Sequence, residues 1–188
     1  MPSSDRPDQR IENAAADLLT IAMSRPPTLG PGRLICVDGP AGSGKTTLAE
    51  AVAEVASAPV IHMDDLYAGW DGLAAGIDQF ATILPPLAEG TTGSYRRYDW
   101  HQGDYAETVM VPPAPLLVVE GVGSGSAAYT DFRTALAWVD APEDVRRSRG
   151  VARDGDTFAQ RWEAWAGAET DHFALDLTAA RADIVVTT

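Results

Sequence analysis

Residues 39–46 read Gly-Pro-Ala-Gly-Ser-Gly-Lys-Thr, and this octapeptide matches the P-loop pattern G-x-x-x-x-G-K-[ST] at every fixed position. Its glycines allow a tight turn that points successive backbone N–H groups into one concavity, which suits the phosphates of a nucleotide. We expect Lys45 to reach the β- and γ-phosphates and the Thr46 hydroxyl to ligate Mg²⁺. The predicted nucleotide-binding residues are Gly39, Ala41, Gly42, Ser43, Gly44, Lys45, Thr46 and Thr47.

The sequence on either side of the octapeptide supports this interpretation. Residues 34–38 form a short apolar run with β-branched side chains, which predicts a strand. Residues 47–56 are rich in helix formers, and Leu48, Val52 and Val55 fall at helical spacing. The order strand, glycine loop, helix directs the positive helix N-terminus at the phosphates. The alternative, a Gly-rich turn that binds nothing, is disfavoured by these flanks.

Composition indicates one acidic globular domain. The chain has 188 residues, of which 45% are hydrophobic, and its net charge is −13. We expect a single domain over 1–188, with an N-terminal helix and linker in 1–32 and a lid at about 143–156. Such an acidic surface disfavours nucleic acid and anionic membranes as partners. The predicted partner is a small molecule, and the composition leaves the oligomeric state open.

Three further features favour a cytoplasmic location. Cys36 is the single cysteine, so no intrachain disulfide is expected, and it is predicted to be a buried small apolar residue. Residues 1–10 are polar and lack the apolar core of a signal peptide. No apolar run approaches the ~20 residues of a membrane span.

Apolar runs alternate with helical segments along the chain. The predicted strands are residues 34–38, 59–63, 116–119, 135–139 and 182–186. Continuous apolar strands that alternate with helices indicate an α/β fold, in which a parallel sheet is covered on both faces as the middle of three layers. Ligands bind such sheets at the carboxyl ends of the strands, so the residues just after each strand are the most informative.

The segments between the strands carry weaker signals. Residues 76–89 are predicted to be a helix that stops or kinks near Leu84, because two prolines follow. Residues 90–105 are rich in Gly, Tyr and Arg, and we expect a loop over a site. A further helix is predicted at about 157–167. The aromatic residues expected to pack the C-terminal part of the chain on the core are Trp162, Trp165 and Phe173.

Acidic side chains follow two of the predicted strands. Asp64 and Asp65 end the second strand, where a carboxylate could orient an acceptor hydroxyl and take its proton. Of the two, Asp64 is the predicted base, and Asp65 is assigned to the acceptor pocket. A helix cap or a solvated turn is the alternative for both. Glu120 ends the third strand and is predicted to hold Mg²⁺, with a hydrogen bond to a neighbouring loop as the alternative.

An arginine cluster follows the fourth strand. Arg146, Arg149 and Arg153 are three and four residues apart, which places them on one face of a helix. Phosphoryl transfer spreads negative charge over the equatorial oxygens, and arginines on a closing lid can stabilise that charge. These three arginines, with Lys45 and Asp64, are the predicted catalytic residues. The alternative is a solvated helix face whose arginines pair with nearby acids.

Residues 95–101 mix aromatic rings, guanidinium groups and an acid, which suits stacking and hydrogen bonding to a small polar acceptor. A surface loop without a ligand is the alternative. The predicted acceptor-binding residues are Asp65, Tyr67, Arg96, Arg97, Tyr98 and Asp99.

Together these stretches resemble the uridine kinase-like branch of P-loop kinases, which includes phosphoribulokinase and pantothenate kinase. The matching stretches follow the family's order between about residues 34 and 155, and they are residues 39–49, 61–67, 95–100, 118–121 and the Arg-rich segment after 140–142. The resemblance implies a five-stranded parallel sheet in the order 2-3-1-4-5 with a lid. It also implies Asp64 as catalytic base, Glu120 as a Mg²⁺-associated acid and Tyr98 in the acceptor pocket. Uridine kinases carry a base-contacting His where this chain has Gly103.

The function expected from these residues is ATP- and Mg²⁺-dependent phosphoryl transfer to the hydroxyl of a small molecule. Two alternatives remain open. A nucleoside monophosphate kinase would use Arg96 and Arg97 to bind the phosphate of its acceptor and would need no carboxylate base. A regulatory P-loop protein would bind nucleotide and do little chemistry.

Overall fold

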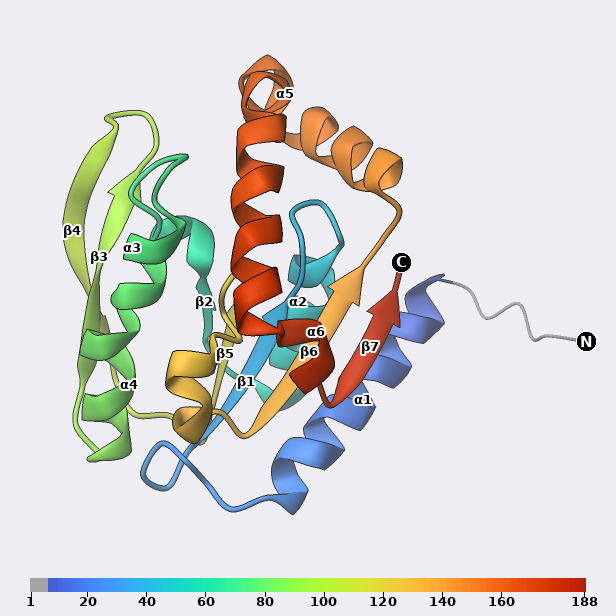
Figure 1. The fold of residues 1–188 in the computed structure, drawn as a ribbon. Helices are drawn as coiled ribbons and strands as arrows, with labels where there is room; N and C mark the ends of the chain where they lie inside the picture. The colour runs from blue at the N-terminus through green and yellow to red at the C-terminus, as the bar shows by residue number, and fades with distance from the viewer. Residues whose placement is uncertain (1–6) are drawn as a thin grey trace, which may run out of the picture.

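The central element of the fold is a five-stranded parallel sheet (Figure 1). The computed structural model describes residues 7–188. The strands of the sheet are β1 (Arg33–Asp38), β2 (Val60–His62), β5 (Leu116–Glu120), β6 (Ala135–Asp140) and β7 (Ile184–Thr187). Their order is β2-β5-β1-β6-β7, which is 2-3-1-4-5 when these five alone are counted. The predicted sheet and its strand order are therefore confirmed.

Helices cover both faces of this sheet. One face packs against α1 (Pro7–Ser24) and α2 (Lys45–Ala56), and the other packs against α3 (Leu73–Asp78), α4 (Phe80–Ala88) and α5 (Glu143–Asp176). Alternate residues of β1 divide between the two layers: Ile35 and Val37 join the α1–α2 cluster, whereas Leu34 and Cys36 join the other. Successive side chains of a strand point to opposite faces, so both layers are anchored on the same strand.

The helix α5 changes direction at Gly155, whose φ of 69° and ψ of −152° are not helical. Its first half leaves β6 and its second half returns to the core, where Trp162 and Trp165 are buried (Figure 1). Phe173 is partly buried against the same cluster, so the three predicted aromatic contacts are present. The second half reaches Asp176, well beyond the predicted end, and is followed by the short α6 (Thr178–Arg181).

Residues 90–105 form much of an antiparallel hairpin, and the predicted loop is wrong. The hairpin pairs β3 (Gly93–Asp99) with β4 (Asp104–Val111). The hairpin is buried only at one end, where Gly93, Tyr95 and Val111 lie. Its other residues are half-exposed or exposed. The β-branched residues that favour a strand lie past residue 105, which is why the composition of 90–105 resembled a loop.

The break expected near Leu84 is also misplaced. The chain interrupts its helix at Gln79, between α3 and α4, and α4 then continues through Pro85 and Pro86 to Ala88. Pro85 and Pro86 cannot donate backbone hydrogen bonds, but the side chains on the buried face of α4 are almost inaccessible to solvent. Those buried side chains are Phe80, Ile83, Leu84 and Leu87. Tertiary packing therefore outweighs the lost hydrogen bonds.

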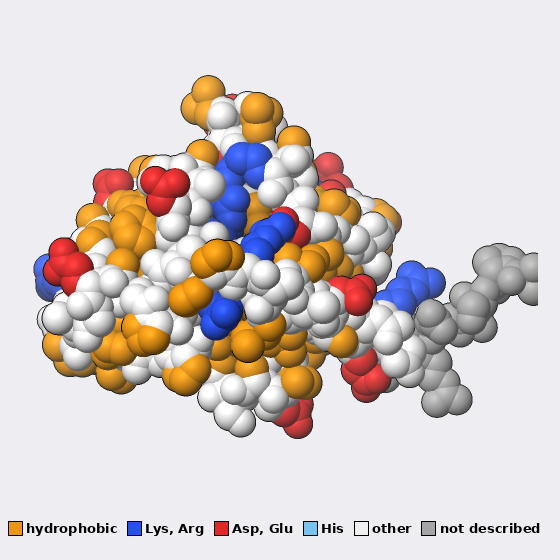
Figure 2. Space-filling view, turned by 90° about the horizontal axis from the view of Figure 1, so that it is seen from below, with side chains coloured by type: hydrophobic (Ala, Val, Ile, Leu, Met, Phe, Trp, Pro, Cys, Tyr) orange, Lys and Arg blue, Asp and Glu red, His pale blue; other side chains and the backbone are white. Residues whose placement is uncertain are grey.

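Two short 3₁₀ segments complete the chain, η1 (Met63–Asp65) directly after β2 and η2 (Ala127–Phe132) before β6. Figure 2 shows the end of the molecule at which the strands of the sheet begin; basic side chains gather near its middle and acidic ones lie mostly around its edge. Within residues 7–188, each helix is too short or too polar to cross a bilayer.

Candidate active site

The glycine loop joins β1 to α2 and has the backbone of a phosphate-binding turn. Gly39, Gly42 and Gly44 have φ values of 140°, 76° and 96°, which residues with side chains rarely adopt. A Cβ on Gly42 would also lie 2.2 Å from the carbonyl oxygen of Arg146, so the loop can pack this closely against α5 only with glycine there. Helix α2 begins at Lys45, so its free N–H groups lie directly after the loop.

Lys45 is folded back across this loop. Its Nζ donates to the carbonyl oxygen of Pro40 at 2.9 Å, and the side chain is largely buried. An ammonium group held over the loop is placed to contact phosphate oxygens bound by the loop amides. Lys45 and Thr46 both line the adjoining cavity, and their roles toward phosphate and Mg²⁺ stay predictions.

Thr46 and Glu120 lie next to each other at the carboxyl ends of the central strands. The Thr46 hydroxyl donates to Oε1 of Glu120 at 3.2 Å, and Glu120 is buried. Hydroxyl and carboxylate oxygens suit Mg²⁺, which takes one or two protein ligands and completes its shell with phosphate and water. Among the described residues no group of three or more His, Cys, Asp or Glu could hold a metal ion alone.

His62 supports Glu120 from β2. Its Nδ1 lies 2.7 Å from Oε1 of Glu120, and this hydrogen bond raises the pKa of His62 despite partial burial of the ring. The sequence placed His62 in the second strand, and it is the last residue of β2. Its contact with Glu120 was not predicted, because it depends on β2 pairing with β5 so that His62 and Glu120 are register partners.

Asp64 and Asp65 lie in η1 and both line the cavity. Asp64 is exposed to solvent and lines the cavity, and desolvation by the protein atoms around it, with the charge of Glu120, raises its pKa. The pKa of Asp65 is also raised, chiefly by burial. A carboxylate with a raised pKa is a better proton acceptor, so both positions suit the predicted chemistry.

One cavity of about 740 Å³ joins these groups. Its volume is in the range of sites for small ligands. Ala41, Gly42, Lys45 and Thr46 line the end formed by the glycine loop, and Asp64, Asp65 and Glu120 supply its carboxylates. The parallel sheet brings these residues together because the strands that precede them end at the same edge.

An aromatic wall completes the cavity. It consists of Tyr67, Trp70, Trp100, Phe158 and Trp165. The ring centroids of Trp70 and Trp100 are 5.2 Å apart in an edge-to-face arrangement, and Trp70 also contacts Phe158 and Trp165. Trp100 is held in place by a hydrogen bond from its Nε1 to the backbone oxygen of Asp64, at 2.8 Å.

Tyr67 is the one residue of this wall that the sequence assigned to the acceptor site. Tyr67 itself is buried, and its hydroxyl donates to the backbone oxygen of Val122 at 2.8 Å. Trp165 was assigned to the core and in fact lies at the boundary between the core and the cavity. The other rings come from a loop, a hairpin turn and α5, which no local pattern connects.

The three arginines of α5 that were predicted to be catalytic divide into two groups. Arg153 lines the cavity and forms an ion pair with Asp154 at 2.7 Å, which raises its pKa. Arg146 and Arg149 instead lie behind the glycine loop and do not line the cavity. Arg149 bonds Thr188 at 2.7 Å and approaches the backbone oxygen of Gly42 at 3.5 Å.

Four of the predicted acceptor-binding residues lie on β3, where they make other contacts and do not line the cavity. Arg97 pairs with Glu107 at 2.7 Å, Arg96 lies over the ring of Tyr105, and Tyr98 packs edge-on against Trp100. Asp99 accepts backbone hydrogen bonds from His101 and Gln102 in the hairpin turn, and these bonds lower its pKa. The turn residues Trp100 and His101 reach the cavity in their place.

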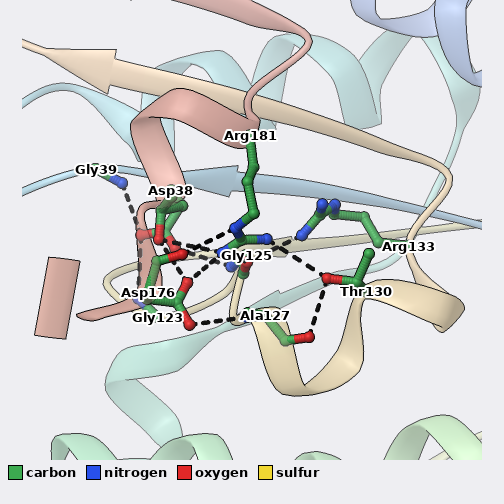
Figure 3. A network of polar contacts seen from close by, with 10 residues as sticks. Asp38, Gly39, Gly123, Gly125, Ala127, Thr130, Arg133, Asp176 and Arg181 are labelled. Carbon is green, nitrogen blue, oxygen red and sulfur yellow. Dashed lines mark hydrogen bonds and ion pairs between the residues drawn. The ribbon is translucent and has the colours of Figure 1, made fainter. Parts of the chain in front are cut away.

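A buried carboxylate beneath the loop escaped the sequence analysis. Asp38 is fully buried and accepts hydrogen bonds from the amides of Gly39, Gly123 and Gly125 at 2.7–3.0 Å (Figure 3). Burial raises its pKa to about 6. Asp38 thereby ties the glycine loop to the segment after Glu120.

The segment after Glu120 also accepts side-chain hydrogen bonds, from two arginines. The carbonyl oxygen of Gly125 accepts from Arg133 at 2.9 Å and from Arg181 at 2.8 Å, and Arg181 pairs with Asp176 (Figure 3). Because this segment begins directly after Glu120, the network holds the predicted metal ligand in place from behind the sheet edge.

Comparisons with known proteins agree with this geometry. No protein-family model matches the chain. A uridine kinase of Borrelia duttonii is 27% identical over 142 residues, covering 65% of this chain and 67% of the relative. A cytidylate kinase of Methanococcoides burtonii is 29% identical over 130 residues, covering 69% of this chain and 68% of the relative.

Solved structures show the same fold at lower identity. A possible uridine kinase from Bacillus stearothermophilus superposes with a TM-score of 0.67 at 20% identity, covering 94% of this chain and 97% of the other. This match shows the fold, and the curated relatives are what support a uridine kinase-like P-loop kinase. A putative fructose transport system kinase from Silicibacter gives a TM-score of 0.63 at 18% identity, over 93% and 98% of the two chains. The relatives support ATP-dependent phosphoryl transfer by this kinase to a small molecule.

Proposed function

We propose that this kinase transfers the γ-phosphoryl group of ATP, with Mg²⁺, to a hydroxyl group of a small-molecule acceptor. The observation that carries the proposal is that Asp64 shares one cavity with Lys45, Thr46 and Glu120. Phosphoryl transfer to an alcohol needs phosphate ligands, metal ligands and a proton acceptor within reach of one acceptor molecule.

The phosphate end of the cavity binds and orients ATP. The loop amides and Lys45 hold the β- and γ-phosphates, and Thr46 with Glu120 would hold Mg²⁺. The metal, when bound, neutralises negative charge on the phosphates. His62 keeps the Glu120 carboxylate in position through the 2.7 Å contact at Oε1.

Asp64 acts on the acceptor. Its carboxylate accepts a hydrogen bond from the acceptor hydroxyl and takes that proton as the new O–P bond forms, while the bond from the γ-phosphorus to the bridging oxygen breaks and ADP leaves with that oxygen. The raised pKa of Asp64 matches this task, because it makes the carboxylate a stronger base than an ordinary aspartate. Arg153, the arginine of α5 that lines the cavity, stabilises negative charge on the transferring group.

The charges of the cavity favour a hydroxyl acceptor over a phosphate acceptor. Asp64 and Asp65 both line it and would repel a dianionic acceptor. Arg96 and Arg97, which a phosphate acceptor would need, have their contacts on the hairpin outside the cavity. The aromatic wall suits an acceptor with a flat or apolar face, such as a nucleoside.

The cytidylate kinase relative makes nucleoside monophosphates the second acceptor class to test. Mg²⁺-dependent ATP consumption should be measured against nucleosides, nucleoside monophosphates, sugars, sugar phosphates and pantothenate-like alcohols. Each acceptor should be tested with the unchanged chain, with Lys45→Ala, with Asp64→Asn, and with Asp71→Asn as a matched control. Asp71 is exposed and does not line the cavity.

We expect an alcohol to raise ATP consumption, Lys45→Ala to abolish turnover, and Asp64→Asn to lower it by about 10²-fold while ATP binding persists. Asp71→Asn should match the unchanged chain. Turnover of nucleoside monophosphates that survives Asp64→Asn would instead identify a nucleoside monophosphate kinase. ATP binding without stimulation by any acceptor would favour a regulatory P-loop protein.

A further inference from the structure

The second half of α5 carries an acidic residue on its buried face. Phe158, Trp162, Trp165 and Glu169 follow one another at spacings of four, three and four residues, so they share one face of the helix. All four are buried, and Glu169 is only 2% exposed. An acid in an apolar stripe is costly to bury unless its oxygens are hydrogen-bonded, so its partners identify its role.

Both hydrogen-bond donors to Glu169 belong to residues that line the cavity. Its Oε1 accepts from the backbone N–H of Ala41 and from Nε1 of Trp165, each at 2.6 Å. Ala41 is the third residue of the glycine loop, and Trp165 belongs to the aromatic wall. Burial raises the pKa of Glu169, and the nearby Lys45 and these two hydrogen bonds oppose that rise. The carboxylate therefore joins the phosphate-binding loop to the opposite wall.

The carbonyl group of Ala41 is held by the other half of α5. Nη1 of Arg146 lies 3.4 Å from that oxygen and 3.9 Å from Oε2 of Glu169. Arg146 also donates from Nε to the carbonyl oxygen of Ala141 at 3.1 Å and lies against the ring of Trp162. The N–H and C=O of one loop residue are thus fixed from the two sides of the break in α5.

We propose that Glu169 is a positioning residue for phosphoryl transfer. It holds the glycine loop in its binding conformation through Ala41. Through Arg146 it also fixes the beginning of the first half of α5, which carries Arg153. Its part in turnover rests on the kinase function proposed above, whereas its part in holding the loop concerns nucleotide binding alone.

Loss of the acceptor oxygen should therefore weaken nucleotide binding. Without it, the N–H of Ala41 and the Nε1 of Trp165 lose their buried partner, and the loop must be ordered by the nucleotide itself. The negative charge of Glu169 is not needed for this role. An uncharged side chain that keeps an oxygen at the same place should hold the loop equally well and should repel the phosphates less.

Three substitutions separate these effects. Glu169→Gln keeps an acceptor oxygen and removes the charge; Glu169→Met keeps the length and removes the acceptor; Glu169→Asp keeps the charge and withdraws the oxygen by one methylene. Glu163→Met, on the exposed face of the same helix, is the matched control. For each variant, thermal unfolding checks the fold, calorimetry gives the Kd for MgATP and MgADP, and kinetics with the best acceptor gives kcat and KM.

We expect Glu169→Met and Glu169→Asp to bind both nucleotides about tenfold more weakly at temperatures where they are fully folded. Their kcat should fall as well, whereas Glu169→Gln should bind no more weakly than the unchanged chain and Glu163→Met should match it. If Glu169→Met does not fold, Glu169→Asp carries the comparison with Glu169→Gln.

Unchanged Kd and kcat in a folded Glu169→Met or Glu169→Asp would overturn the proposal, as would an equal loss in Glu169→Gln. The binding experiment needs no acceptor. A chain that phosphorylates no acceptor would contradict the proposed function, yet its nucleotide affinities would still decide whether Glu169 positions the loop.

Discussion

The break in α5 predicts that one substitution has opposite effects at two glycines of the same helix. Gly155 has φ 69° and ψ −152°, a conformation that is essentially restricted to glycine. A Cβ built on Gly155 meets no atom within 4 Å, so Gly155→Ala tests backbone strain without a steric clash. A non-glycine residue held there costs about 1–3 kcal/mol, partly offset by about 0.4–1 kcal/mol from the stiffer unfolded chain. We expect a net loss of about 1–2 kcal/mol in the free energy of unfolding.

Gly167→Ala is the matched control. Gly167 lies in the second half of α5 with ordinary helical φ, is exposed, and also has open space around its Cβ position. Alanine in place of glycine inside a helix stabilises it by about 0.8–1 kcal/mol. Urea unfolding of the two variants should therefore shift the midpoint in opposite directions. For a chain of this size, each kcal/mol corresponds to about 2–4 °C in Tm.

A Gly155→Ala substitution that stabilised the protein would contradict this prediction. If both substitutions raised the free energy of unfolding by about 1 kcal/mol, residues 143–176 would form a continuous helix in solution. Arg153 lies two residues before Gly155, so its side chain would then point in a different direction. The assignment of Arg153 to the cavity would be wrong.

Further predictions concern an ion pair, a buried hydroxyl and the metal ligand. Burial alone would raise the pKa of Asp183, but hydrogen bonds from Arg25 and a backbone amide outweigh it and the pKa is lowered. The resulting stability is present above the unfolded pKa of about 4 and is lost as the pH falls through the lower folded pKa. Asp183→Asn should thus cost about 1 kcal/mol at neutral pH and progressively less as the pH falls below about 4. A difference in urea unfolding that does not change with pH would contradict this. Tyr67→Phe leaves the carbonyl oxygen of Val122 without its partner and should lower the free energy of unfolding by about 1–2 kcal/mol with little change in kcat. A large fall in kcat in a folded variant would instead show that the hydroxyl contacts substrate. Glu120→Gln should raise the Mg²⁺ concentration for half-maximal turnover by about tenfold, measured by Mg²⁺ titration at saturating ATP, and an unchanged Mg²⁺ dependence would remove this residue from the metal site.

Much of the candidate site could be predicted because its residues follow from short-range patterns. The glycine loop is set by eight consecutive residues, and Asp64 and Glu120 follow apolar strands. The carboxyl ends of parallel strands meet at one edge, so these acids had to approach Lys45 once the sheet had the order 2-3-1-4-5. Their chemical roles remain predictions until the variants are measured.

Other parts of the site depended on where side chains point after packing. Arg146, Arg149 and Arg153 share a helix face, but the first two meet carbonyl oxygens of the glycine loop, and only the last extends past the loop to the cavity. The stretch 95–99 has the composition of a binding loop, yet strand pairing directs its charged groups to the hairpin itself. Helical or strand spacing predicts which residues share a face, and it does not predict what that face meets.

The glycine loop, the alternation of strands and helices and the acids at the strand ends follow from sequence alone, because each depends on residues close together in the chain. Three features depend on tertiary packing: which arginine reaches the cavity, which rings form its wall, and the contact between Glu169 and Ala41. These last two residues are 128 positions apart. Their contact depends on how the returning half of α5 packs against the sheet, and that packing is fixed by the whole core rather than by any local pattern.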